Sequence, residues 1–163
     1  MLDVHSRAQS QETQTYVVAR KDHKPLLILH VEDDENDAIL FRKACERAGL
    51  PAETFRLDAA DLARAYLLGE GIYSDRVLYP LPQIIVLDLK MPRMDGFEFL
   101  KWLRQDDRFS GIPVLVFTAS ISGEDKSRAL AEGASSFFIK PASFEALVKM
   151  VAGFGPPKDG RWN

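Results

Sequence analysis

Acidic side chains follow two short apolar runs, and their types suit metal binding and attack on phosphorus. Glu32 and Asp33 come directly after the run at 26–31, and Asp88 comes directly after the run at 84–87. Like charges held close together are unfavourable unless a cation neutralises them. Mg²⁺ prefers oxygen ligands, takes one or two carboxylates and keeps positions for water or phosphate oxygens. A cluster of these three acids would therefore suit Mg²⁺.

Two more polar residues occupy corresponding places after apolar runs. Thr118 follows the run at 113–117, and Lys140 follows the run at 137–139. A carboxylate can act as a nucleophile and accept a phosphoryl group as an acyl phosphate. Such a transfer needs charge stabilisation on the phosphoryl oxygens. Lys140 can supply a cation for this purpose, and Thr118 can supply a hydroxyl.

The elements that would carry these residues alternate along the chain. We predict strands at 26–31, 53–57, 84–87, 113–117 and 137–139, and helices at 35–48, 59–69, 96–105, 122–132 and 144–151. Strand-helix alternation with helical crossovers is typical of a parallel sheet covered by helices on both faces. The fold class is therefore α/β. We expect a flavodoxin-like (βα)5 doubly wound sandwich with a five-stranded parallel sheet in the order 2-1-3-4-5.

This topology predicts where the chemistry lies. In a doubly wound sheet, ligands bind at the carboxyl ends of the strands beside the topological switch point. The first and third strands are neighbours there, so Glu32, Asp33 and Asp88 should share one small pocket. In contrast, Asp34 and Asp95 are expected to be helix N-caps. His30 lies inside a strand that reads as buried, so we interpret it as a core histidine with its hydrogen bonds satisfied.

Length, composition and charge restrict the class of protein. The 163 residues suit one domain, which we place at 25–152, with a flexible N-terminal leader at 1–24 and a C-terminal tail at 153–163. The net charge of −3 provides no basic footprint for nucleic acid or an anionic membrane surface. Cys45 is the only cysteine, which excludes an intrachain disulfide and suits a reducing compartment. With neither a signal peptide nor a membrane-length apolar run, the expected location is the cytoplasm.

Four motifs together carry a resemblance to a known family. The stretches 31–34 (VEDD), 86–96 (VLDLKMPRMDG), 117–119 (FTA) and 138–141 (FIKP) resemble the receiver domain of CheY-like response regulators. The resemblance covers about residues 25–152. It implies a two-component signalling switch that takes a phosphoryl group from a histidine kinase in a Mg²⁺-dependent reaction and changes its protein contacts. It implies no enzyme activity beyond the protein's own aspartyl phosphorylation and dephosphorylation.

The resemblance also implies a role for each matching residue. Asp88 would be the phosphoacceptor, and Mg²⁺ would be held by Glu32, Asp33, Asp88 and the backbone carbonyl of Lys90. Thr118 would bond the phosphoryl group, and Lys140 would pair with it. Thr118 and Phe137 would form the switch. Because Phe137 has no hydroxyl, its readout would depend on packing alone.

One connection departs from the plain receiver pattern. The stretch 69–83 is longer than the ~2–6 residues usual between a helix and a strand, and it contains Ile72, Tyr73, Leu78, Tyr79 and Leu81. We expect it to extend the second helix and to fold back on the domain. Such a connection resembles the stand-alone receivers that accompany bacterial phytochromes. That resemblance implies a phytochrome-type sensor kinase as partner, an unknown downstream protein, and a homodimer formed through the fourth- and fifth-helix face.

Several other interpretations stay open from the residues alone. Glu32 and Asp33 could merely complement a helix N-terminus, Thr118 could be a strand-end hydroxyl, and Lys140 could be a solvated loop lysine. The protein could also be a phosphorelay shuttle or an unphosphorylated pseudo-receiver scaffold. A third alternative is a phosphohydrolase that forms an aspartyl phosphate. The haloacid-dehalogenase pattern needs an acid two positions after the nucleophile, where this chain has Lys90.

Overall fold

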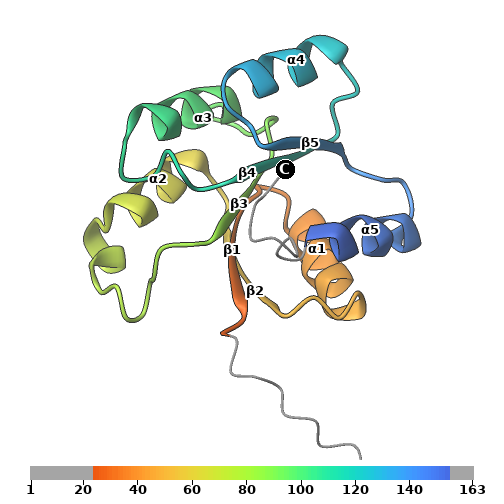
Figure 1. The fold of residues 1–163 in the computed structure, drawn as a ribbon, viewed down its shortest axis with the longest axis horizontal. Coiled ribbons are helices and arrows are strands. Elements are labelled where there is room, and N and C mark those ends of the chain that lie inside the picture. Colours follow the sequence, from red (N-terminus) through yellow and green to blue (C-terminus); the bar gives the residue numbers. More distant parts are fainter. Residues whose placement is uncertain (1–23, 155–163) are drawn as a thin grey trace, which may run out of the picture.

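Five parallel strands form one sheet at the centre of the computed structural model, which describes residues 24–154 (Figure 1). The strands are β1 (Leu26–Val31), β2 (Ala52–Leu57), β3 (Ile84–Leu87), β4 (Val114–Thr118) and β5 (Ser136–Ile139). Their order is β2-β1-β3-β4-β5, which confirms the flavodoxin-like topology predicted from the sequence. The crossover from β2 past β1 to β3 creates the switch point beside β1 and β3.

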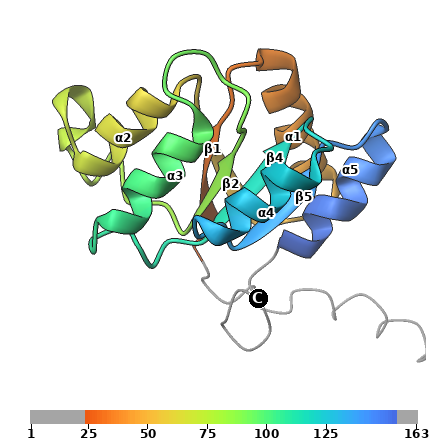
Figure 2. The ribbon, with the colours of Figure 1, turned by 90° about the horizontal axis from the view of Figure 1, so that it is seen from above.

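Helices cover both faces of this sheet. They are α1 (Glu35–Arg47), α2 (Ala60–Leu68), α3 (Gly96–Gln105), α4 (Gly123–Ala131) and α5 (Phe144–Val151), with 3₁₀ turns η1 (Gly71–Ser74) and η2 (Ala152–Phe154). Figures 1 and 2 show α1 and α5 together on one side of the sheet, and α2 and α3 on the other. No helix within residues 24–154 has both the length and the apolar character needed to cross a membrane.

The strands supply two separate hydrophobic cores. In β1, Leu29 and Val31 belong to the core under α2 and α3, whereas Ile28 belongs to the core under α1 and α5. All four residues of β3 are buried, as expected for a central strand covered on both faces. Burial on both faces leaves the strand ends as the places where polar side chains can meet.

Side chains cap four of the helices. Asp34 accepts a hydrogen bond from the Asp37 N–H, and Asp95 accepts one from the Phe97 N–H. Ser122 and Ser143 cap α4 and α5 in the same way. The predicted cap roles of Asp34 and Asp95 are confirmed, and each cap anchors a helix that starts beside the site described below.

The connection between α2 and β3 differs from the prediction. Gly69 adopts a left-handed conformation (φ 72°), which ends α2 at Leu68, so the helix is not extended. The expectation that the segment folds back is confirmed, because Tyr73 and Tyr79 pack on Tyr66 with ring centroids 5.2 and 6.1 Å away. The guanidinium of Arg76 also donates hydrogen bonds to the carbonyls of Tyr66 and Leu67. Three of its apolar residues nevertheless stay largely exposed: Ile72, Val77 and Leu78.

The described residues include only small parts of the expected leader and tail. The leader at 1–24 lies outside the described residues except for Lys24, and so does most of the tail. Phe154, which we assigned to the tail, is buried and packs on Phe138 with ring centroids 5.0 Å apart. The folded part of the described chain therefore reaches Phe154.

Candidate functional site

Three carboxylates meet where β1 and β3 end side by side. Val31 pairs with Leu87 in the parallel register, so the residues that follow, Glu32 and Asp88, are neighbours. One carboxylate oxygen from each of Glu32, Asp33 and Asp88 lies within 4.8 Å of the others. The structure thus brings together the acids that the sequence placed in one pocket. We call these three residues the acidic trio.

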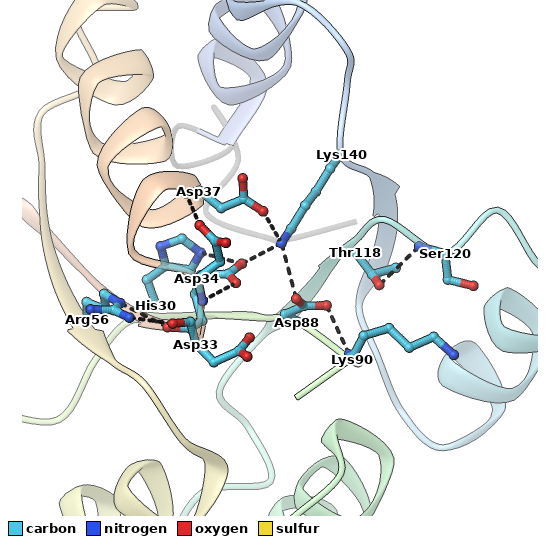
Figure 3. A network of polar contacts seen from close by, with 11 residues as sticks. His30, Asp33, Asp34, Asp37, Arg56, Asp88, Lys90, Thr118, Ser120 and Lys140 are labelled. Carbon is cyan, nitrogen blue, oxygen red and sulfur yellow. Dashed lines mark hydrogen bonds and ion pairs between the residues drawn. The ribbon is translucent and has the colours of Figure 1, made fainter. Parts of the chain in front are cut away.

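Lys140, in the loop after β5, reaches into this pocket (Figure 3). Its Nζ lies 2.6 Å from Glu32 Oε2, 3.1 Å from Asp88 Oδ2 and 2.7 Å from Asp37 Oδ2. An ammonium has three N–H donors, so these three contacts use its full capacity. The Lys140 side chain is therefore an ion-paired part of the pocket and not a solvated loop lysine.

Burial and charge act in opposite directions on the ionisable groups here. Burial raises the pKa of Glu32 to about 7, although the hydrogen bond from Lys140 limits the rise. Burial alone would lower the pKa of Lys140, but its bonds to Asp37 and Glu32 and the charge of Asp88 raise that pKa above its usual value. Lys140 thus stays a cation and makes the nearby negative charge tolerable.

Backbone contacts hold the acids in position. Arg56, on the neighbouring strand β2, donates hydrogen bonds to the carbonyls of Glu32 (2.9 Å) and Asp33 (2.8 Å). The Lys90 N–H donates to Asp88 Oδ1 at 3.0 Å. These bonds fix both the main chain of β1 at its end and the rotamer of Asp88.

Gly96 allows the close approach of α3 to the phosphoacceptor candidate. A Cβ at this position would lie 2.7 Å from the Asp88 carbonyl oxygen and 2.8 Å from the Leu89 Cα. Both contacts are with backbone, which cannot swing aside as a flexible side chain can. The Asp95-Gly96 pair therefore serves two purposes, a helix cap and a close helix–strand contact.

Thr118 and Phe137 lie on adjacent strands, and Phe137 pairs with Val116, two residues before Thr118. Thr118 is the last residue of β4 and is completely buried, and its Oγ1 accepts a hydrogen bond from the Ser120 N–H. Phe137 in β5 is partly buried against the core under α2 and α3. Both lie where the sequence placed them, and their switch role stays a prediction.

A further ion pair joins the loops around Asp88. The Nζ of Lys90 lies 3.2 Å from Asp125 Oδ2, on the first turn of α4. The same oxygen accepts a hydrogen bond from the Ser120 hydroxyl. The loop after β3 and the start of α4 are therefore connected directly by this ion pair.

His30 differs from the expected satisfied core histidine. Its ring is buried and packs on Phe41 with centroids 4.4 Å apart, so the core position is correct. However, its Nε2 has no hydrogen-bond partner among the described residues and lies 4.0 Å from Glu32 Oε2. Burial lowers the pKa of His30 to about 3 and keeps the ring neutral. The prediction failed because a strand pattern shows burial but not which polar atoms lie nearby.

The acidic trio fits a hard divalent cation. Its donors are all carboxylate oxygens, the ligand type that Mg²⁺ prefers. The Lys140 ammonium pairs with two members of the trio, Glu32 and Asp88, and with Asp37. One positive charge shared among these carboxylates leaves negative charge for a cation to neutralise. The assignment of the Lys90 carbonyl as a fourth ligand stays a prediction.

Sequence reasoning missed two residues of this network, Asp37 and Arg56. Asp37 reads as one of several acids in the first turn of a helix, where such residues are common. Arg56 is the next-to-last residue of a weak strand, and its sequence context does not distinguish it from a solvent-exposed arginine. For Arg56, only the predicted strand order, with β2 beside β1, could have pointed to the end of β1.

Comparison with known proteins agrees with this geometry. Residues 28–152 match the model of the response regulator receiver domain family. A probable methanogenesis regulatory protein, FilR2 of Methanothrix harundinacea, is 38% identical over 128 residues, covering 78% of this chain and 79% of that protein. The crystal structure of response regulator RPA3017, in red light signaling of R. palustris, has a TM-score of 0.76 at 27% identity and covers 79% of this chain and 90% of that one. The phosphorylated cyanobacterial phytochrome response regulator RcpA has a TM-score of 0.73 at 30% identity and covers 80% and 91%.

Proposed function

Because this chain belongs to the response regulator receiver family, we propose that it is a signalling switch phosphorylated on Asp88 by a histidine kinase. The observation that carries this proposal is the arrangement at Asp88. One oxygen accepts a hydrogen bond from the Lys90 N–H, the other lies 3.1 Å from Lys140 Nζ, and two further carboxylates stand beside it. Asp88 thus contacts a cation and belongs to the acidic trio that would hold a metal ion.

The proposed reaction transfers one phosphoryl group. A carboxylate oxygen of Asp88 attacks the phosphorus atom of a phosphohistidine, and the P–N bond breaks with its electron pair going to the imidazole nitrogen. The product is an acyl phosphate on Asp88. Catalysis under this proposal is confined to the formation and hydrolysis of that one bond.

The neighbouring residues would stabilise the charge that this transfer brings into the pocket. Lys140 would pair with a phosphoryl oxygen, and the Thr118 hydroxyl would donate a hydrogen bond to another. Glu32, Asp33, Asp88 and the Lys90 carbonyl would hold Mg²⁺. The ion, when bound, would neutralise charge on the carboxylates and the phosphoryl group.

Phosphorylation would then change which partners the protein binds. Drawing Thr118 toward the phosphoryl group would let Phe137 repack, and the face formed by α4, β5 and α5 would change with it. Leu130, Ile139 and Phe144 on these elements are already partly exposed. Such a switch is a shift between two states, and phosphorylation moves it only through contacts that differ between them. This face would serve a downstream protein or a second copy of the chain.

The similarity to the phytochrome response regulator RcpA supports a phytochrome-type sensor histidine kinase as the donor. The first test uses a small phosphodonor, acetyl phosphate, with Mg²⁺. We expect the wild type to gain one base-labile phosphoryl group by mass, and Asp88→Asn to gain none. Asp107→Asn removes an exposed acid outside the trio and should behave as the wild type. Phosphorylation of Asp88→Asn at the wild-type rate, or no phosphorylation of the wild type by acetyl phosphate or by a phosphorylated phytochrome kinase, would overturn the proposal.

A further inference from the structure

The third carboxylate that contacts Lys140 lies outside the acidic trio. Asp37 belongs to the first turn of α1, and its Oδ2 is 2.7 Å from Lys140 Nζ, closer than Asp88 Oδ2 at 3.1 Å. We propose that Asp37 is a positioning residue that holds the Lys140 ammonium beside Asp88, ready for the phosphoryl group. This inference rests on the proposed function, because it assigns Asp37 a role in that same transfer.

Lys140 needs such an anchor because its side chain is long and flexible. Holding a lysine side chain in one rotamer costs conformational entropy that its contacts must offset. Its shortest contact is with Glu32, but Glu32 also belongs to the trio that would hold Mg²⁺. Asp37 is the partner of Lys140 that has no second role, so this contact can persist when the trio binds a cation.

Asp37 is itself held firmly enough to serve as an anchor. Its backbone N–H donates a hydrogen bond to the N-cap carboxylate of Asp34 at 2.9 Å, which fixes the first turn of α1. The Asp37 side chain is 40% exposed, so it lies at the rim of the pocket. Its carboxylate points toward Lys140 (Figure 3). The Lys140 ammonium thus contacts Asp37 of α1 on one side and Asp88, at the end of β3, on the other.

A purely electrostatic role for Asp37 makes the opposite prediction. If Asp37 merely added negative charge, its removal would reduce the repulsion between the pocket and the anionic phosphodonor, and phosphorylation would become faster. If it positions Lys140, its removal lets the ammonium move away and slows the transfer, because small misplacements of catalytic groups are costly. The sign of the effect therefore separates the two roles.

The experiment compares the wild type, Asp37→Asn and a matched control, Glu35→Gln. Glu35 lies in the same helical turn, carries the same charge and makes no ion pair among the described residues. With saturating Mg²⁺ and increasing acetyl phosphate, we expect Asp37→Asn to lower the maximal phosphorylation rate roughly 10-fold. We expect Glu35→Gln to stay within about 2-fold of the wild type, because its charge is screened at the surface.

A second measurement follows Lys140 directly. The ammonium ¹H–¹⁵N signal of a lysine is visible when hydrogen bonds slow its exchange with water, and Lys140→Arg identifies which signal belongs to Lys140. We expect this signal in the wild type and in Glu35→Gln, and its loss in Asp37→Asn. A change confined to overall stability would leave the signal in place.

The outcomes keep the two proposals apart. If the wild type is phosphorylated and Asp37→Asn is equally fast or faster, the positioning role is overturned and the proposed function stands. If the wild type is not phosphorylated, both fall. Slower transfer by Asp37→Asn together with loss of the Lys140 signal supports both.

Discussion

Lys140 and Glu32 lie 108 positions apart in the chain, yet the Nζ of one is 2.6 Å from the Oε2 of the other. The Glu32 side chain is completely buried, and the Lys140 side chain is only 14% exposed. This contact joins the end of β5 to the end of β1 across the sheet. It places a cation against the acidic trio, and the stability of the pocket should depend on it.

Replacing Lys140 should therefore destabilise the protein in a way that Mg²⁺ opposes. In the presence of EDTA, we expect Lys140→Met to lose about 3 kcal/mol of unfolding free energy, because the carboxylates then lack their cation. Added Mg²⁺ should recover part of this loss by binding the folded state. Urea unfolding with EDTA or Mg²⁺ measures both effects. Lys101→Met, at an exposed position of α3, should change little; an equal loss there, or no effect of Mg²⁺, would contradict the prediction.

A methyl group at position 96 should disturb the site through the backbone. Gly96→Ala would place Cβ 2.7 Å from the Asp88 carbonyl oxygen, so α3 or the end of β3 must shift. We expect a loss of about 1–3 kcal/mol, typical of overpacking, with slower phosphorylation of Asp88. Gly123→Ala is the control, since a Cβ there meets nothing within 4 Å. Equal unfolding free energies for the two variants would refute this explanation of Gly96.

Arg76 should hold the connection between α2 and β3 against the domain. Its guanidinium donates hydrogen bonds to the carbonyls of Tyr66, Leu67 and Tyr79. Arg76→Met would leave these carbonyls without that donor, and we expect a loss of about 1 kcal/mol with faster chymotrypsin cleavage in 69–83. Arg42→Met, on the exposed side of α1, should leave the cleavage rate unchanged. Cleavage at the same rate in both variants would mean that aromatic packing alone holds the connection.

Cys45 should be unreactive in the folded protein. The thiol is buried, and burial raises its pKa from 9.0 to about 12, so little thiolate forms. We expect slow reaction with a disulfide reagent at pH 8 and rapid reaction in urea. Fast labelling of the folded protein would show that the thiol is accessible.

The raised pKa of Cys45 also predicts how the free energy of unfolding depends on pH. Because the pKa of Cys45 is higher in the folded than in the unfolded chain, its contribution is complete below pH 9 and declines as the pH rises toward about 12. The difference in unfolding free energy between the wild type and Cys45→Ala should therefore be constant below pH 9 and shrink above it. A constant difference across the whole range would show that Cys45 does not titrate differently on unfolding.

Local patterns in the sequence, together with the rules of parallel-sheet topology, were sufficient to predict the fold and the residues that meet at the carboxyl ends of the strands. Apolar runs of strand length, Asp34 and Asp95 before helices, and polar residues at strand ends are all visible over a few positions. The rule that parallel strands end at one edge then brings Glu32 and Asp88 together without knowledge of side-chain positions. The family resemblance added the residue roles.

Only the tertiary structure decided which partner each polar atom meets. Gly69 ends α2 although apolar residues follow it, Asp37 rather than another acid of its turn reaches Lys140, and the His30 Nε2 is left without a partner among the described residues. A lysine side chain can reach several acids within a few ångströms. Which of them it contacts depends on how α1 and the end of β5 pack on the sheet, and periodicity in the chain does not encode that distance.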